Sequence, residues 1–160
     1  MLYLLLKAVH VVAVIIFMGN IITGVFWKVH ADRTSDPRIM AHALEGIIRS
    51  DRLFTIPGVV LITAAGFAAA IVGRIPILGT GWILWALALF TISGLAFILG
   101  VAPLQVRLAA LARSGLDAGQ LDRPAYHRLS RQWELWGLVG TLSPALAVLL
   151  MILKPVLPSL

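Results

Sequence analysis

Four stretches of the chain carry no charged side chain and are each long enough to cross a lipid bilayer. They are residues 8–27, 53–73, a stretch within 75–106, and 135–153. A helix needs about 20 apolar residues to span the hydrocarbon core. Because lipid offers the backbone no hydrogen bonds, such segments must be helical. The sequence therefore predicts an all-α polytopic membrane protein, a bundle of four transmembrane helices.

Composition supports one membrane domain and excludes a soluble fold. Charged residues make up 12% of the chain, whereas soluble domains average about 25%. We expect a single domain of residues 1–160 with spans at about 2–28, 53–73, 82–104 and 133–153. The first apolar run is too long for a signal peptide and is predicted to remain as a helix. The absence of cysteine excludes thiolate metal sites and thiol redox chemistry.

Basic residues predict the orientation of the bundle. Ten of the thirteen lysines and arginines flank the loop after the first span or the loop after the third: Lys28, Arg33, Arg38, Arg49, Arg52, Arg107, Arg113, Arg123, Arg128 and Arg131. The positive-inside rule assigns both loops to the cytoplasm. Both termini are then expected on the outer, periplasmic side of a bacterial-type inner (plasma) membrane. The basic loops are expected to attract anionic inner-leaflet lipids, at about 1 kcal/mol per residue, rather than nucleic acid.

The first loop carries an amphipathic pattern. Asp36 and Pro37 are typical of a helix start. One helical face after them is apolar and the other polar, which predicts a short amphipathic cytoplasmic helix between helices 1 and 2, lying at the inner leaflet. Just before this loop, Trp27 and Lys28 are predicted to anchor helix 1 at the interface.

Small residues recur within the spans at helical spacing. Such residues let helices approach closely in lipid, where packing drives association. The pattern predicts helix contacts at Thr63 with Gly66, at Ser93 and Gly94 with Gly100, and at Gly137, Gly140 and Thr141.

His10 is the only histidine within a predicted span. It shares one side of helix 1 with Lys7, and Asn20 lies at the edge of that side. An intramembrane histidine is by default a candidate functional residue, and a neutral imidazole is a standard axial ligand of haem iron. The alternative is that His10 bonds a carbonyl or a water between helices.

The remaining histidines, His30, His42 and His127, lie in the cytoplasmic loops. With the neighbouring arginines they form a basic rim, which suits anionic lipid or anionic groups such as propionates. Glu134 is the carboxylate near the fourth span, and a structural ion pair with the nearby Arg131 is expected.

Several short runs resemble a known family. Leu6-Lys7-Ala8-Val9-His10, Phe26-Trp27-Lys28-Val29-His30-Ala31, Arg52-Leu53-Phe54-Thr55-Ile56-Pro57-Gly58 and Met151-Ile152-Leu153-Lys154-Pro155 resemble the DUF2269-type family of predicted integral membrane proteins. The tryptophans of the fourth helix, Trp133 and Trp136, fit the same family. This resemblance spans essentially the whole chain.

A more distant resemblance is to the J-type (HemJ-like) membrane protoporphyrinogen oxidase. It implies a haem b cofactor, with His10 and His30 matching the family's two histidines of helix 1 and Arg52, Pro57, Lys154 and Pro155 matching further positions. The chain departs from that family where the third helix begins. Residues 82–87 are wholly apolar, so no second ligand is supplied there.

Three hypotheses for function follow. The first is a haem b or tetrapyrrole-binding redox protein, a haem-dependent membrane oxidoreductase if it is an enzyme. His10 would be the metal ligand, and Lys7, Asn20, His30 and Arg52 would complete the cofactor site. The second is a cofactor-free accessory or scaffold protein that packs against a membrane partner or a second copy. The third is transport of a small solute or metal by an oligomer.

Overall fold

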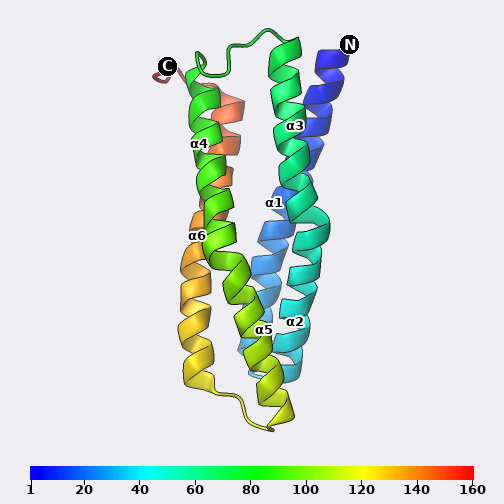
Figure 1. Cartoon of the computed structure of the whole chain (residues 1–160), viewed down its shortest axis with the longest axis vertical. Helices are drawn as coiled ribbons and strands as arrows, with labels where there is room; N and C mark the ends of the chain where they lie inside the picture. Colours follow the sequence, from blue (N-terminus) through cyan, green and yellow to red (C-terminus); the bar gives the residue numbers. More distant parts are fainter.

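A computed structural model describes residues 1–160 and is built from helices alone (Figure 1). The elements are α1 (Leu2–Thr34), α2 (Pro37–Ser50), the π-helical turn η1 (Asp51–Thr55), α3 (Ile56–Val72), α4 (Gly81–Ala96), the π-helical turn η2 (Phe97–Val101), α5 (Ala102–Asp117) and α6 (Arg123–Leu153). Because η1 joins α2 to α3 and η2 joins α4 to α5 without a break, these elements make four long helices.

Each of the four long helices has the length and composition to cross a membrane. They run Leu2–Thr34, Pro37–Val72, Gly81–Asp117 and Arg123–Leu153. At about 1.5 Å per residue, a helix of 31 residues or more exceeds the ~30 Å hydrocarbon core. The predicted all-α bundle of four membrane-crossing helices is confirmed. The exact limits of the spans stay predictions.

The two ends of the bundle differ. Both chain termini and the α3–α4 loop lie at one end, here named the terminal end (Figure 1). The α1–α2 and α5–α6 loops lie at the other, the loop end. At the loop end, α2 and α6 begin at capped positions, where Asp36 accepts a hydrogen bond from Arg38 N at 2.8 Å and Asp122 from Ala125 N at 3.0 Å. Side-chain caps satisfy backbone donors that a helix start leaves free.

The amphipathic helix after the first loop differs from the prediction. It is present as α2, but it continues through η1 into α3 instead of lying separately on a leaflet. Its apolar face packs against α5 and α1, and Met40, Leu44 and Ile47 on it are buried. The prediction was wrong on this point because an amphipathic pattern shows that one face is covered without showing whether lipid or protein covers it.

The main buried core lies toward the loop end. It is formed by α2, η2, α5 and α6 and comprises Met40, Ala41, Leu44, Val101, Leu104, Leu108, Ala112, Tyr126 and Trp133. A smaller cluster, Ala13, Phe17 and Ile62, lies between α1 and α3. The helices are therefore packed together most extensively where the loops are.

Toward the terminal end the bundle divides into two helix pairs, α1 with α3 and α4 with α6 (Figure 1). No Cα atom of α3 lies within 8 Å of one in α4 or α6, and none of α1 lies that close to α4. The side chains of Phe17 and Phe90 bridge the pairs, with ring centroids 5.7 Å apart in an edge-to-face arrangement. The helix pairs are therefore not packed closely against each other, and cavities lie between them.

Small residues mark some of the helix contacts, as predicted. Gly66 lies against His10, and Gly100 lies against Trp136. Ser93 Oγ donates a hydrogen bond to the Gly140 carbonyl at 2.7 Å, which joins α4 to α6. Gly94 differs, because a Cβ there would meet no atom within 4 Å.

Gly100 of η2 and Gly94 of α4 allow a matched test of how the third long helix packs against α6. A Cβ at Gly100 would lie 2.2 Å from Trp136 Cγ, so Gly100→Ala must displace the indole and should lower the free energy of unfolding by about 1–3 kcal/mol. Gly94→Ala should have no such cost. Thermal unfolding in detergent measures both, and equal melting temperatures for the two variants would contradict this packing.

Candidate functional site

Two cavities lie between the helix pairs. The terminal cavity, toward the terminal end, has a volume of about 590 Å³ and is lined mainly by apolar side chains together with Lys7, His10 and Lys154. The middle cavity has a volume of about 620 Å³ and reaches Asp51 and Gln105. Because Phe17 and Phe90 line both, this aromatic pair lies between them.

His10 is fixed at the wall of the terminal cavity by one hydrogen bond. Its Nδ1 lies 2.8 Å from the Ile62 carbonyl oxygen of α3. A carbonyl only accepts, so Nδ1 carries the proton and Nε2 of the neutral ring keeps its lone pair. No protein group bonds Nε2. The expected alternative, a bond from His10 to a carbonyl of another helix, is what the structure shows, and it leaves the second nitrogen free.

Gly66 provides the space for this imidazole. A Cβ at that position would lie 2.9 Å from His10 Nδ1 and 3.0 Å from its Cε1. Real Cβ atoms do not approach ring atoms so closely, so a larger residue in place of Gly66 would displace the ring. Gly66 thus leaves room for His10 to reach Ile62.

Cationic groups flank the terminal cavity. Lys7 and Lys154 are both in its lining and both are exposed. The Lys154 ammonium lies over the Trp82 ring, 5.4 Å from the centroid. The chain has no group of three or more His, Cys, Asp or Glu side chains arranged to hold a metal ion. A metal here would therefore depend on His10 and on the group that carries the metal.

The other predicted site residues lie elsewhere. His30 is exposed on α1 at the loop end, where its ring stacks on Phe26 at 6.0 Å between centroids. Arg52 is exposed beside Asp51. Asn20 lines the middle cavity rather than the terminal one. The structure thus brings His10 and Lys7 together and leaves the other three apart from them.

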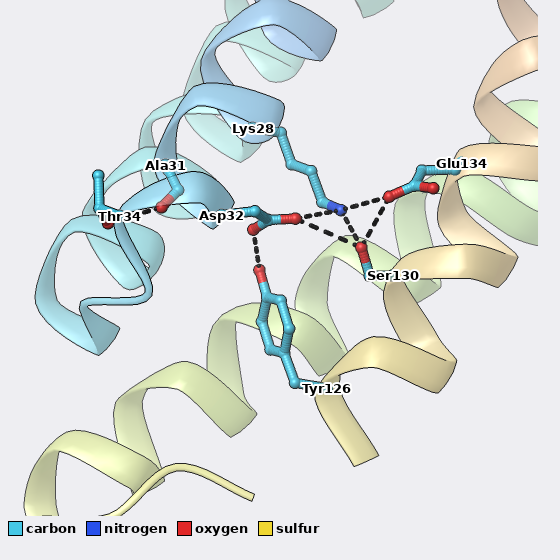
Figure 2. A network of polar contacts seen from close by, with 7 residues as sticks. All are labelled: Lys28, Ala31, Asp32, Thr34, Tyr126, Ser130 and Glu134. Carbon is cyan, nitrogen blue, oxygen red and sulfur yellow. Dashed lines mark hydrogen bonds and ion pairs between the residues drawn. The ribbon is translucent and has the colours of Figure 1, made fainter. Parts of the chain in front are cut away.

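A polar network at the loop end was missed by the sequence analysis (Figure 2). The side chain of Lys28 is 0% exposed, and its Nζ lies 2.7 Å from Asp32 Oδ2 and 3.3 Å from Glu134 Oε1. Nζ also donates to Ser130 Oγ, and it lies 5.1 Å from the Trp133 ring centroid. The network links α1 to α6.

Tyr126 extends the same network (Figure 2). Its hydroxyl donates to Asp32 Oδ1 at 2.7 Å, and the residue is 2% exposed. Burial, together with the neighbouring Asp32 carboxylate, raises the pKa of the Tyr126 phenol above its ordinary value. The phenol therefore stays protonated and keeps donating to Asp32.

Two predictions about these residues are corrected. Lys28 does not extend to the interface beside Trp27, because it is enclosed by its anionic partners. The expected structural ion pair of Glu134 is present, but its partner is Lys28 rather than Arg131. Asp32 stands four positions after Lys28, a local spacing that the sequence analysis did not use. Ser130 and Glu134 stand 102 and 106 positions away, so no local pattern indicates the pairing with α6.

A second polar cluster surrounds Asp51 at the wall of the middle cavity. Thr55 Oγ1 donates to Asp51 Oδ1 at 2.7 Å, and Asn20 Nδ2 does so at 3.2 Å. Gln105 Nε2 donates to the other oxygen, Oδ2, at 3.1 Å. Asn20 also donates to Thr55 Oγ1 at 2.9 Å. The cluster joins α1, η1 and α5 through hydrogen bonds from neutral groups.

Comparison with known families agrees with this architecture. Residues 4–155 match the family model DUF2269, described as a predicted integral membrane protein. The chain belongs to the DUF2269 family. No curated protein and no solved structure matches it. For this DUF2269 protein, the family establishes an integral membrane protein, and the geometry of the two cavities and two polar clusters carries the argument about function.

Removing the buried cation should destabilise the fold. Lys28→Met leaves Asp32 and Glu134 without a counter-charge, and we expect a loss of about 2–3 kcal/mol, less than for a fully enclosed pair because Glu134 is half-exposed. Arg131→Met, on the exposed face of α6, is the control. Unfolding in detergent measures both, and an equal loss in the two variants would show that the Lys28 network does not hold the helices.

Proposed function

We propose that the protein binds haem b or a related tetrapyrrole in the terminal cavity, with His10 Nε2 as the axial ligand. The observation that supports this is the state of the His10 ring. Its Nδ1 is held by the Ile62 carbonyl at 2.8 Å, while Nε2 has no protein partner in the wall of a cavity. A histidine ligand commonly donates its other N–H to a backbone carbonyl, which fixes the tautomer and the ring orientation.

The surroundings fit a tetrapyrrole in shape and charge. The cavity, at about 590 Å³, is mainly apolar and falls within the usual range of small-molecule sites, about 300–1,000 Å³. Lys7 and Lys154 in its lining supply cations for two carboxylate side groups. Such a group, when bound, would supply one-electron transfer, which makes an oxidoreductase the proposed enzyme class.

A second axial ligand would come from another part of the lining. The apolar opening of the third long helix offers none, but Met151 of α6 is in the wall of the terminal cavity. Methionine together with histidine is a known ligand set for haem iron, so Met151 would be the further residue to hold the group.

The absorption spectrum tests this proposal. Protein purified in detergent after expression with added haem should show a Soret band and reduced α and β bands. His10→Ala should abolish these bands because it removes the axial nitrogen, whereas His30→Ala should leave them unchanged. A melting curve for each variant checks folding.

A folded but colourless wild-type protein would contradict the proposal and favour a cofactor-free scaffold protein that acts through a membrane partner. Bands that persist in His10→Ala would show that the group is held elsewhere.

We also propose that the loop end faces the cytoplasm and the terminal end faces outward, in a bacterial-type inner membrane. The ten basic residues near the two loops support this orientation. They also support binding of anionic lipid headgroups at the loop end.

Single cysteines can report the orientation because the chain has none of its own. Ser159→Cys marks the terminal end and Ser114→Cys the loop end, and both positions are exposed. In intact cells, a membrane-impermeant maleimide should label Ser159→Cys and should reach Ser114→Cys only after permeabilisation. The reverse pattern would overturn the orientation.

A further inference from the structure

Asp51 is a buried carboxylate without a counter-charge. It is 8% exposed, and its hydrogen-bond partners Asn20, Thr55 and Gln105 are all neutral. The ion pairs of the protein involve Lys28 and Arg113, and neither reaches Asp51. A carboxylate held away from water is costly unless a cation or a proton compensates it. Asp51 therefore lacks the partner that a purely structural carboxylate would have.

Two further polar atoms in the same cavity have no partner. Trp133 Nε1 and Thr141 Oγ1 are buried and make no hydrogen bond. The whole Trp133 residue is 3% exposed. Both residues line the middle cavity together with Asp51. Buried polar groups are nearly always paired, and the two that the protein leaves unpaired both belong to residues in the wall of this cavity.

The two π-helical turns of the long helices both border this cavity, and each is followed within two residues by a proline, Pro57 or Pro103. The turn η1 begins at Asp51, and residues Phe97 and Val101 of η2 also line the cavity. Single π-helical turns inside α-helices are often found at functional sites. Here η1 turns Asp51 toward Asn20 of α1 and Gln105 of α5.

The cavity walls are apolar and aromatic. Just over half of the lining residues are hydrophobic, and they include the aromatic residues Phe17, Phe90, Phe97 and Trp133; most of the rest are glycines and neutral hydroxyl or amide residues. Aromatic faces attract cations through the ring quadrupole, most strongly where water is excluded. A single negative charge combined with apolar and aromatic walls is complementary to a molecule that is itself positively charged and apolar.

We propose that the middle cavity binds a lipophilic organic cation, with Asp51 as its counter-charge and Phe17 and Phe90 against its apolar body. An anion would meet the Asp51 carboxylate unfavourably, whereas a cation would replace the proton that otherwise compensates it. The site is separate from His10 and does not rest on the proposed tetrapyrrole.

Tetraphenylphosphonium, an apolar cation without hydrogen-bond donors, is the probe. Isothermal titration into the full-length protein in detergent should show saturable binding. Asp51→Asn keeps the shape of the side chain but removes the charge, and it should weaken binding by about tenfold or more. The control Asp117→Asn, exposed at the end of α5, should bind as the wild type does.

A second variant tests the place of binding while Asp51 stays intact. A Cβ at Gly94 meets no atom within 4 Å, and Gly94 lines the cavity, so Gly94→Phe should fill the space without straining the backbone. It should abolish binding while the melting temperature stays near that of the wild type. Triphenylphosphine oxide, a neutral analogue, should bind at least about tenfold more weakly than the cation.

Three results would overturn the proposal. They are no saturable binding of tetraphenylphosphonium by the wild type, unchanged binding by a folded Asp51→Asn or Gly94→Phe protein, and equal binding of the neutral analogue.

Discussion

Two contacts near the loop end hold the first two long helices to the last two. They are the packing of α2 against α5 and the buried Lys28 network between α1 and α6. Within a membrane there is little hydrophobic drive between helices, so close packing and hydrogen bonds must hold them. Inside each pair these are supplied by Gly66, Gly100 and the Ser93 bond to Gly140. Between the pairs, α3 has no Cα atom within 8 Å of α4 or α6, and the Phe17–Phe90 ring pair bridges the gap; the cavities occupy the space that this wide spacing leaves.

Much of the fold can be read from the sequence, because a charge-free run of about 20 residues has few structural alternatives in lipid. Which residues contact one another across different helices cannot be read from the sequence. Lys28 beside Trp27 reads as an anchor because long basic side chains commonly reach the interface, yet its anionic partner on α6 is remote in the chain. The Asp51 cluster likewise collects Asn20, Thr55 and Gln105 from three separate elements. The sequence offers one signal for this cluster, because Gln105 is an isolated polar residue at the end of an apolar segment.

His10 shows how much of the candidate site can be predicted from the sequence. From the sequence, a bond to a carbonyl and a role as ligand stand as alternatives. The structure makes them compatible, because the imidazole has two nitrogens and only one is used by Ile62. The decisive facts are the distance across to α3 and the glycine that permits it, and both depend on how two helices pack.

The separation of the two helix pairs also affects how a ligand arrives. The walls of both cavities belong to helices suited to cross the membrane, and both cavities are partly open. An opening between the two helix pairs at the depth of the bilayer would lead into the hydrocarbon. An apolar compound would use such an opening to enter sideways from the bilayer, where it is concentrated by its partition coefficient. The affinity measured against its concentration in water would then combine partitioning with binding, and a change of lipid would alter apparent selectivity without altering any residue of the site.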